Sequence, residues 1–188
     1  MTDLKCIHTV FPEVFILEPK VYSDERGFFV ETYNESKLKK HGVYTKFIQD
    51  NHSRSIKGTL RGLHYQLKHP QVKLVSVICG EVMDVVVDIR KGSSTYLQHI
   101  TVVLSEENQR SLYIPKGFAH GFYTCSDIAD FCYKCSDIYY PEDSYGVKWD
   151  DPILSIPWPG THPLLSKKDK ELPYISSINL DFLPSYQK

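Results

Sequence analysis

The sequence of 188 residues lacks any long hydrophobic run and any excess of charge of one sign. No stretch approaches the roughly 18 apolar residues that span a bilayer, and Met1 to Lys5 does not show the basic and then apolar order of a signal peptide. Lys and Arg number 22 against 23 Asp and Glu, for a formal net charge of −1. Nucleic-acid-binding surfaces normally carry a strong cationic excess. We therefore expect neither a membrane nor a nucleic acid as partner.

Cysteine is sparse, and its arrangement excludes a disulfide scaffold. The five cysteines (Cys6, Cys79, Cys125, Cys132 and Cys135) are odd in number and follow no secreted spacing. Free thiols suit a reducing compartment, so we expect a cytoplasmic protein. Cys132 and Cys135 form a CxxC pair, but no second pair or nearby histidine completes a zinc site. We interpret both as structural.

The composition is that of an ordinary globular chain. It is 41% apolar and 24% charged, which is enough apolar material for a sizeable core. The length suits one domain, and no repeat or linker divides it. We expect a single domain over residues 1–188, in which the proline-rich residues 141–188 wrap irregularly around the rest.

Short β-type runs dominate and indicate an all-β sandwich or barrel. Turn residues separate them at spacings of roughly 8 to 12 residues. The expected strands cover 14–17, 27–33, 46–51, 58–66, 72–78, 81–89, 100–104, 110–114, 121–124 and 129–140. Gly80, between two valine-rich runs, predicts a tight hairpin turn. Only 34–41 and 166–172 indicate helices, capped by Asn34 or Ser36 and by Ser166 respectively.

Two histidines on separate β-type runs are the most informative feature. His64 lies in Leu60–Gln66, and His120 lies in Ile114–Phe122. Metal-dependent barrels usually present His-x-His followed by a carboxylate and a later histidine, whereas Gln66 stands where the second histidine would be. One histidine from each half is too few for a metal site. We therefore expect no metal and favour proton transfer.

General acid–base chemistry needs a base, an orienting carboxylate, an oxyanion donor and an acid. His64 is the best base, because an unperturbed histidine has a pKa near 6.5, and Asp169 is a candidate to fix its tautomer. Lys73 or His120 could donate to an enolate oxygen. A tyrosine, with an ordinary pKa of about 10, could return a proton to the opposite face.

Each of these residues also has a plainer interpretation. A lone histidine in a β-protein is usually a surface or hydrogen-bonded core residue, and Lys73 could face outward from its strand. Among 13 tyrosines, chemistry alone does not distinguish Tyr133. Arg26 and Arg61 each stand beside a glycine, where an arginine fork suits diphosphate oxygens, but either could form an ordinary turn salt bridge.

Seven strings appear in the order typical of one family. Together they resemble the dTDP-4-dehydrorhamnose 3,5-epimerases over essentially residues 5 to 170. The strings are Phe28–Glu31, Gln49–Ser53, Leu60–Gln66, Gly80–Val82 through Val87–Arg90, Pro115–Phe122, Tyr133–Lys134 and Trp149–Pro152.

The resemblance implies a metal-free, cupin-type double-stranded β-helix (a jelly roll) with a few short helices. It implies a homodimer with exchanged N-terminal strands and no cofactor, and none of the Gly-rich dinucleotide motifs is present. The implied reaction is proton abstraction at C3 and C5, the carbons flanking the C4 ketone of a dTDP-linked 6-deoxyhexose. One base and one enolate-stabilising site could serve both carbons.

The resemblance also assigns roles by position. His64 matches the base, Asp169 its partner carboxylate, Tyr133 the proton donor and Lys73 the residue that steadies the enolate. The aromatic pair Tyr139 and Tyr140 matches the position of the nucleobase-stacking side chain, without distinguishing the two. Positions that contact the nucleotide sugar are matched by Arg26, Glu31, Gln49, Asp50, Asn51, Arg61, His120 and Lys168.

Departures from the family pattern surround the expected site. Residues 65–72 are one residue shorter than usual, with Val72 in place of a frequent glycine, which could displace Lys73. Ser144 stands where a carboxylate is common, and Tyr145 where arginine is common. These changes affect ligand contacts and specificity rather than the acid–base set.

The leading hypothesis is a 3,5-epimerase of the dTDP-L-rhamnose pathway. A relative that epimerises only C3 or only C5 of another 4-keto nucleotide sugar would share the same residues. A nucleotide-sugar-binding cupin without activity belongs to a different class, and the intact acid–base set argues against it. A metal-dependent cupin isomerase or oxygenase is the remaining alternative, which stoichiometric metal in the purified protein would favour.

Overall fold

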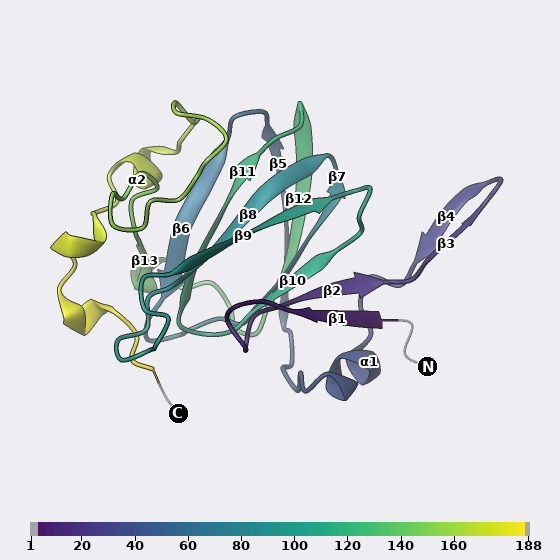
Figure 1. Cartoon of the computed structure of the whole chain (residues 1–188), viewed down its shortest axis with the longest axis horizontal. Helices are drawn as coiled ribbons and strands as arrows, with labels where there is room; N and C mark the ends of the chain where they lie inside the picture. Colours follow the sequence, from purple (N-terminus) through teal and green to yellow (C-terminus); the bar gives the residue numbers. More distant parts are fainter. Residues whose placement is uncertain (1–3, 187–188) are drawn as a thin grey trace.

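The computed structural model describes residues 4–186 and consists mainly of two facing antiparallel β-sheets (Figure 1). In spatial order, the six-stranded sheet contains β1 (Leu4–His8), β2 (Phe15–Pro19), β10 (Ser111–Ile114), β7 (Lys73–Cys79), β12 (Ile128–Cys135) and β5 (Gln49–Ile56). The five-stranded sheet contains β13 (Ser144–Gly146), β6 (Leu60–Gln66), β11 (Phe118–Thr124), β8 (Glu81–Asp88) and β9 (His99–Ser105). The predicted all-β, cupin-type fold is confirmed.

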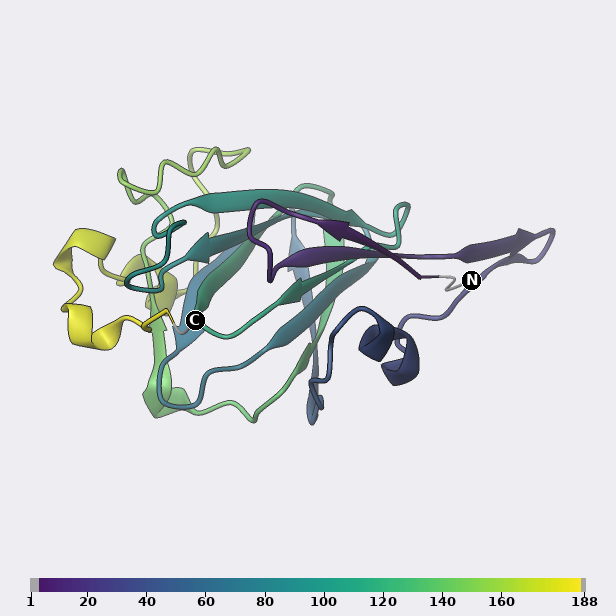
Figure 2. The ribbon, with the colours of Figure 1, turned by 60° about the horizontal axis from the view of Figure 1, so that its bottom comes forward.

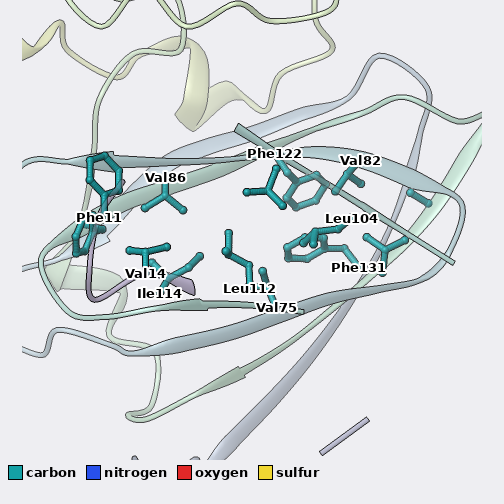
Figure 3. Packing of buried hydrophobic residues seen from close by; sticks show 14 residues of the cluster. Phe11, Val14, Val75, Val82, Val86, Leu104, Leu112, Ile114, Phe122 and Phe131 are labelled. Atoms are coloured by element: carbon teal, nitrogen blue, oxygen red, sulfur yellow. The ribbon is translucent and has the colours of Figure 1, made fainter. Parts of the chain in front are cut away.

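The core lies between the sheets, where alternate side chains of each strand meet (Figure 3). On β12, Ala129 and Phe131 are almost fully buried in this cluster. Phe131 stacks on Phe122 of the opposite sheet, with ring centroids 4.1 Å apart. Burying a side chain of this size stabilises the fold by about 1.5–3 kcal/mol. The aromatic contact therefore fastens the two sheets to each other, and both rings also line a cavity between them.

The short helices begin where the sequence predicts caps. In α1 (Glu35–Lys40), the Asn34 side chain accepts a hydrogen bond from the Lys37 backbone at 3.1 Å. In α2 (Lys167–Lys170), Ser166 accepts one from the Asp169 backbone at 3.1 Å. A side-chain oxygen at this position satisfies one of the free N–H groups of a first helical turn. Single-turn 3-10 helices occur at η1 (Pro141–Asp143), η2 (Ile175–Ser177) and η3 (Leu180–Phe182).

The predicted hairpin at Gly80 is wrong. Strands β7 and β8 flank this glycine but belong to different sheets, so the chain crosses from one sheet to the other there. Gly80 has φ +74°, and a Cβ at this position would clash with the carbonyl oxygen of Ile128. The glycine is needed for a tight crossover instead of a return turn.

Several strand boundaries also differ from the sequence-based expectation. Strand β12 ends at Cys135 instead of residue 140, and β5 begins later than expected. Residues 141–188 are not wholly irregular, because β13 pairs with the edge of β6, with Tyr145 opposite Tyr65. Tyr145 packs on Tyr65, with ring centroids 5.7 Å apart. The Tyr145 side chain therefore belongs to the packing under the C-terminal segment.

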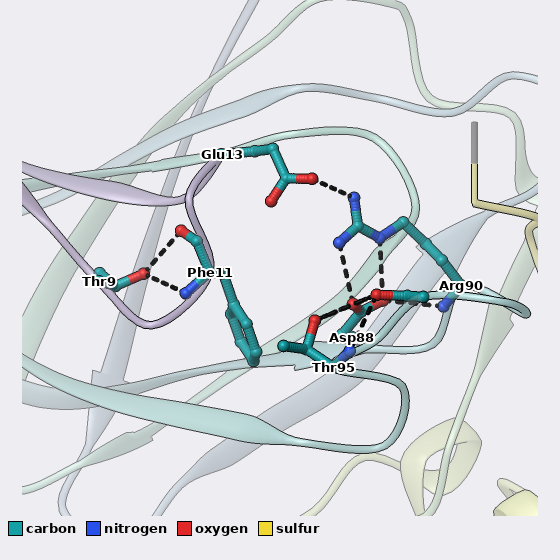
Figure 4. A network of polar contacts seen from close by, with 7 residues as sticks. Thr9, Phe11, Glu13, Asp88, Arg90 and Thr95 are labelled. Atoms are coloured by element: carbon teal, nitrogen blue, oxygen red, sulfur yellow. Dashed lines mark hydrogen bonds and ion pairs between the residues drawn. The ribbon is translucent and has the colours of Figure 1, made fainter. Parts of the chain in front are cut away.

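An ion-pair network built on the buried pair Asp88–Arg90 joins the turn after β1 to the end of β8 (Figure 4). The Arg90 guanidinium donates to both oxygens of Asp88 at 2.9 Å and to Glu13 at 2.9 Å. Its carbon Cζ lies 4.1 Å from the ring centroid of Phe118. Asp88 also accepts from Thr95 at 2.7 Å. This network is structural and lies outside the cavity.

The hairpin of β3 (Val21–Asp24) and β4 (Gly27–Val30) extends away from the two sheets (Figures 1 and 2). It exposes Phe28 by 60% and Phe29 by 68%. Such aromatic exposure on a protruding ribbon is typical of an interaction surface. Across residues 4–186, no helix is both long and apolar enough to cross a membrane.

Candidate active site

A cavity of about 470 Å³ lies between the sheets and collects most of the predicted site residues. All four expected catalytic side chains line it, although they come from three strands and α2. The predicted residues that line the cavity are Gln49, Asn51, Arg61, His64, Lys73, His120, Tyr133, Tyr139, Lys168 and Asp169.

Two glycines allow the strands carrying the histidines to approach closely. Gly62 on β6 has φ +130°, and a Cβ there would lie 2.5 Å from the Cα of Gly121. A Cβ on Gly121 would lie 2.6 Å from the carbonyl oxygen of Arg61. Because neither residue has a side chain, β6 and β11 can pair with His64 opposite His120. The local sequence thus brings both histidines to one cavity.

His64 of β6 and Asp169 of α2 form a hydrogen-bonded pair. The His64 Nε2 atom lies 2.5 Å from Oδ1 of Asp169. The Asp169 side chain is only 5% exposed, against 34% for His64. Burial alone would raise the pKa of Asp169, but the hydrogen bond and charge of His64 bring it below its ordinary value. The carboxylate therefore remains ionised and can orient the imidazole.

His120 of β11 pairs with a second carboxylate, Asp84 of β8. Its Nε2 lies 2.8 and 3.0 Å from the two Asp84 oxygens, and Asp84 is fully buried. Asp84 is not among the residues predicted from the sequence. The sequence signal that could have identified Asp84 is a carboxylate within the valine-rich run 82–87. Asp84 pairs with Phe122 of β11, so both side chains lie on the same face of the sheet.

Lys73 of β7 faces inward, next to Tyr133 of β12. The Lys73 ammonium lies 5.9 Å from the centroid of the Tyr133 ring. Burial lowers the pKa of Lys73, while the nearby Cys135 and Asp84 act in the opposite direction. Burial raises the pKa of Tyr133. Lys73 lines the cavity, so the interpretation of Lys73 as an outward-facing strand residue is wrong.

Of Tyr65 and Tyr133, which both line the cavity, Tyr133 is the one whose hydroxyl is available. The Tyr65 hydroxyl donates to the carbonyl of Phe182 at 3.0 Å, and burial raises the pKa of Tyr65 to about 12. Within residues 4–186, the Tyr133 hydroxyl makes no hydrogen bond to another side chain or backbone group.

Cationic side chains outnumber carboxylates around the cavity. Arg61, Lys73 and Lys168 line it, whereas Asp169 is the one carboxylate among the described lining residues. Lys168 donates to the hydroxyl of Ser144 at 2.7 Å, so its charge has a neutral partner there. An excess of positive charge in a closed site favours an anionic ligand.

The side chains of Tyr139 and Tyr140 have different surroundings. Tyr140 stacks on His69 with ring centroids 3.8 Å apart and an interplanar angle of 17°, so one of its ring faces is occupied. Tyr139 lines the cavity and is 51% exposed. Only Tyr139 of the two presents a ring toward the space where a ligand would lie.

Four predicted site residues do not line the cavity of their own chain; they are Arg26, Glu31, Asp50 and Tyr140. Asp50 accepts from the Lys134 ammonium at 3.0 Å on the outer face of its sheet. Arg26 is at the turn of the protruding hairpin, paired with Asp24 at 2.5 Å. Glu31 follows the hairpin and accepts from Asn34 at 3.1 Å.

The donor set near the cavity does not assemble a metal site. Within residues 4–186, no group of three or more His, Cys, Asp or Glu side chains is placed to hold a metal ion. His64 and His120 each bind a different carboxylate instead.

The fold and the cavity define a cupin-type protein with acid–base residues around a cationic cavity. Comparison of the sequence with protein families is consistent with this class: the profile described as dTDP-4-dehydrorhamnose 3,5-epimerase matches residues 8–177. The chain therefore belongs to the dTDP-4-dehydrorhamnose 3,5-epimerase family.

Individual relatives show the same likeness. The dTDP-4-dehydrorhamnose 3,5-epimerase of Shigella flexneri is 51% identical over 168 residues, covering 88% of this chain and 93% of that protein. The dTDP-6-deoxy-D-glucose-3,5-epimerase of Legionella pneumophila, solved with dTDP-4-keto-L-rhamnose, is 50% identical with a TM-score of 0.96, covering 98% and 100% of the two chains. ChmJ, a 3'-monoepimerase of Streptomyces bikiniensis solved with dTDP-quinovose, is 32% identical with a TM-score of 0.91, covering 96% and 93%.

Proposed function

We propose that this protein is an isomerase that epimerises dTDP-4-dehydro-6-deoxy-D-glucose at C3 and C5. The product is dTDP-4-dehydro-L-rhamnose, an intermediate of dTDP-L-rhamnose biosynthesis. The observation that carries the proposal is the His64–Asp169 pair in one cavity with Lys73 and Tyr133. Membership of the epimerase family supports it.

His64 is the proposed base. When its Nε2–H donates to Asp169, the lone pair of the neutral imidazole is on Nδ1, and this atom accepts the proton from C3 or C5. The buried carboxylate then stabilises the imidazolium that forms, as in other His–Asp pairs. Because the C4 ketone acidifies both flanking carbons, one base serves both centres.

Lys73 and His120 are the proposed donors to the C4 oxygen. Because the His120 Nε2–H is bonded to Asp84, His120 donates through Nδ1 as an imidazolium whose charge the Asp84 carboxylate balances. Proton loss moves negative charge onto this oxygen, and fixed donors in a water-poor site stabilise such charge strongly. Lys73 is an inward-facing cation on β7, and Asp84 holds the His120 ring from behind. The two donors reach the cavity from opposite sheets, so the ketone would lie between them.

Tyr133 is the proposed acid that returns the proton. It is on β12, in the sheet opposite the one that carries His64. An epimerisation requires removal from one face of the carbon and delivery to the other. Burial raises the pKa of Tyr133, so its hydroxyl retains its proton at neutral pH and is able to donate it to an enolate.

The remaining lining residues suit the nucleotide. The Arg61 and Lys168 side chains carry the positive charge that a diphosphate requires, and Gln49 and Asn51 add amide groups beside them. Tyr139 is the proposed stacking platform for the nucleobase, because its ring is exposed to the cavity whereas one face of Tyr140 is covered by His69.

We further propose a homodimer in which the β3–β4 hairpin reaches the partner subunit. The hairpin extends from its own sheets and exposes Phe28 and Phe29. Arg26 and Glu31 do not line their own cavity. Exchange of hairpins would bury the aromatic pair and bring these two charged residues to the partner's site.

We assign the whole chain to one epimerase domain that works in the cytoplasm. All five cysteines are free, which suits a reducing compartment. The C-terminal residues supply Lys168 and Asp169 to the same cavity as the strands, so the site needs both parts of the chain.

Proton NMR in D₂O tests the proposed activity. The protein is incubated with dTDP-4-dehydro-6-deoxy-D-glucose, and the product is trapped by a reductase as dTDP-L-rhamnose. Deuterium at both C3 and C5 is the expected result. Incorporation at a single carbon would identify a monoepimerase of the ChmJ kind, and absence of exchange at both carbons would overturn the proposal.

A further inference from the structure

The segment that carries Tyr139 is held in an unusual way. Strand β12 ends at Cys135, and the last strand-like contact is the backbone pair between Ser136 and Val72 at 3.0 Å. From Asp137 to Tyr139, the part of the chain that the structure describes shows no backbone–backbone hydrogen bond. Exposed backbone without a neighbouring strand is normally mobile, so other groups must fix Tyr139.

Three glutamine side chains take the place of the missing strand. The Gln71 amide donates to the carbonyls of residues 137 and 138 at 2.9 and 3.0 Å. The Gln49 side-chain oxygen accepts from the Tyr139 N–H at 3.0 Å, and the Gln66 oxygen accepts from the Tyr140 N–H at 3.1 Å. Successive backbone groups of the segment are thus bonded to side chains of β5, β6 and the loop after β6.

The segment over residues 66–71, which supplies Gln66 at the end of β6 and Gln71 in the following loop, is itself fixed. The Gln66 amide donates to the carbonyl of His69 at 2.7 Å, and the buried Asp143 accepts from the backbone N–H of Lys68 and His69 at 3.1 and 2.7 Å. The His69 ring covers one face of Tyr140.

We propose that the loop over residues 66–71 positions Tyr139 and so sets the affinity for the nucleoside part of the substrate. The inference rests on the proposed function, in which Tyr139 stacks on the base. Gln71 is the decisive positioning residue, because its one amide bonds two adjacent carbonyls immediately before Tyr139. Holding a ring in its bound orientation before the ligand arrives lowers the ordering cost of binding.

The central experiment is a double-mutant cycle on dTDP binding by calorimetry. Gln71→Met retains the length of the side chain but loses the donor. We expect about a tenfold rise in the Kd for dTDP, which corresponds to about 1.4 kcal/mol of binding free energy. Tyr139→Ala should weaken binding as well. In the Tyr139→Ala background, Gln71→Met should have no further effect, because coupled residues are not additive. Gln98→Met is the matched control on an exposed glutamine.

Two further readouts separate positioning from direct contact or loss of fold. Amide hydrogen exchange of a peptide covering 137–140 should accelerate in Gln71→Met and remain unchanged in Gln98→Met. Turnover at saturating substrate should stay within about twofold of the wild type while KM rises, as expected for loss of uniform binding.

Each outcome bears on a different statement. An unchanged Kd in Gln71→Met, or a Gln71→Met effect that persists fully without the Tyr139 ring, would overturn the positioning role. A Tyr139→Ala variant with normal dTDP affinity would overturn the stacking role. A wild-type protein that fails to bind dTDP at all would instead contradict the proposed function.

Discussion

The Nε2 atom of His64 lies 2.5 Å from Oδ1 of Asp169, although 105 positions separate the two residues in the chain. One residue is on a central strand, and the other is in a four-residue helix capped by Ser166. The carboxylate holds one nitrogen of an imidazole that lines the cavity. The two side chains therefore act as one unit, and a change to either should alter the chemistry of both.

Replacing the proposed base should remove most of the activity. We expect His64→Asn to lower kcat by about 10²–10⁴-fold, the usual contribution of a positioned base, and to abolish deuterium exchange at both carbons. Steady-state kinetics and NMR in D₂O measure these effects. His162→Asn, on an exposed histidine, is the control, and near-normal turnover of His64→Asn would contradict the assignment.

The Asp169 carboxylate should contribute pH-dependent stability. The pKa of Asp169 in the folded protein is below the ordinary value. The stabilisation that this carboxylate contributes is therefore fully present above about pH 4, where an unfolded Asp is ionised. It is lost as the pH falls through the lower pKa of the folded protein. Urea unfolding should therefore show wild type more stable than Asp169→Asn at pH 7, with the difference shrinking in acid. If the difference in unfolding free energy between wild type and Asp169→Asn grows in acid, the pKa of Asp169 is not lowered by folding and the prediction is wrong.

Removing the proposed acid should separate exchange from turnover. In Tyr133→Phe, His64 still abstracts a proton and returns it to the same face, so solvent exchange should persist while product formation falls by about 10²-fold or more. The dTDP affinity should change little. Tyr44→Phe, at a tyrosine that is 76% exposed, is the control; a defect confined to binding would remove the donor role from Tyr133.

The buried Asp84 should matter through His120. Asp84→Asn retains the shape but loses the charge, and hydrogen bonds to charged groups are worth about 1.5–3 kcal/mol, equivalent to about 10- to 100-fold in kcat. The pH profile of kcat should change shape, which a purely structural role would not produce. Asp127→Asn, on a side chain that is 97% exposed, should behave as wild type.

Hairpin exchange makes a prediction about mixed dimers. Arg26→Ala and His64→Asn should each be nearly inactive alone. If Arg26 serves the partner's cavity, a mixed dimer has one intact site and one doubly defective site, so co-expression should restore about a quarter of wild-type activity for random pairing of two subunits. Failure to regain activity in purified heterodimers would place Arg26 outside the partner's site.

The sequence allowed much of the fold to be predicted, because the signals involved are local. Strand alternation identified most strands of both sheets, and Asn34 and Ser166 begin the two helices as expected. The early end of β12 was not predictable in this way. The residues after Cys135 are as apolar and aromatic as a strand, and only the bonds from the side chains of Gln49, Gln66 and Gln71 show what replaces the ladder.

Residue types in the site were determined by the sequence itself: a histidine on each of two glycine-containing strands, a lysine, a tyrosine and a C-terminal carboxylate. Tertiary structure decided which of them meet. Sheet register joins His120 to Asp84 across 36 positions, an Asp that composition and spacing did not identify, and it turns Lys73 inward. The same register separates β7 from β8 at Gly80, where a hairpin was expected. Such pairings depend on how strands far apart in the chain align, and no short window of residues contains that information.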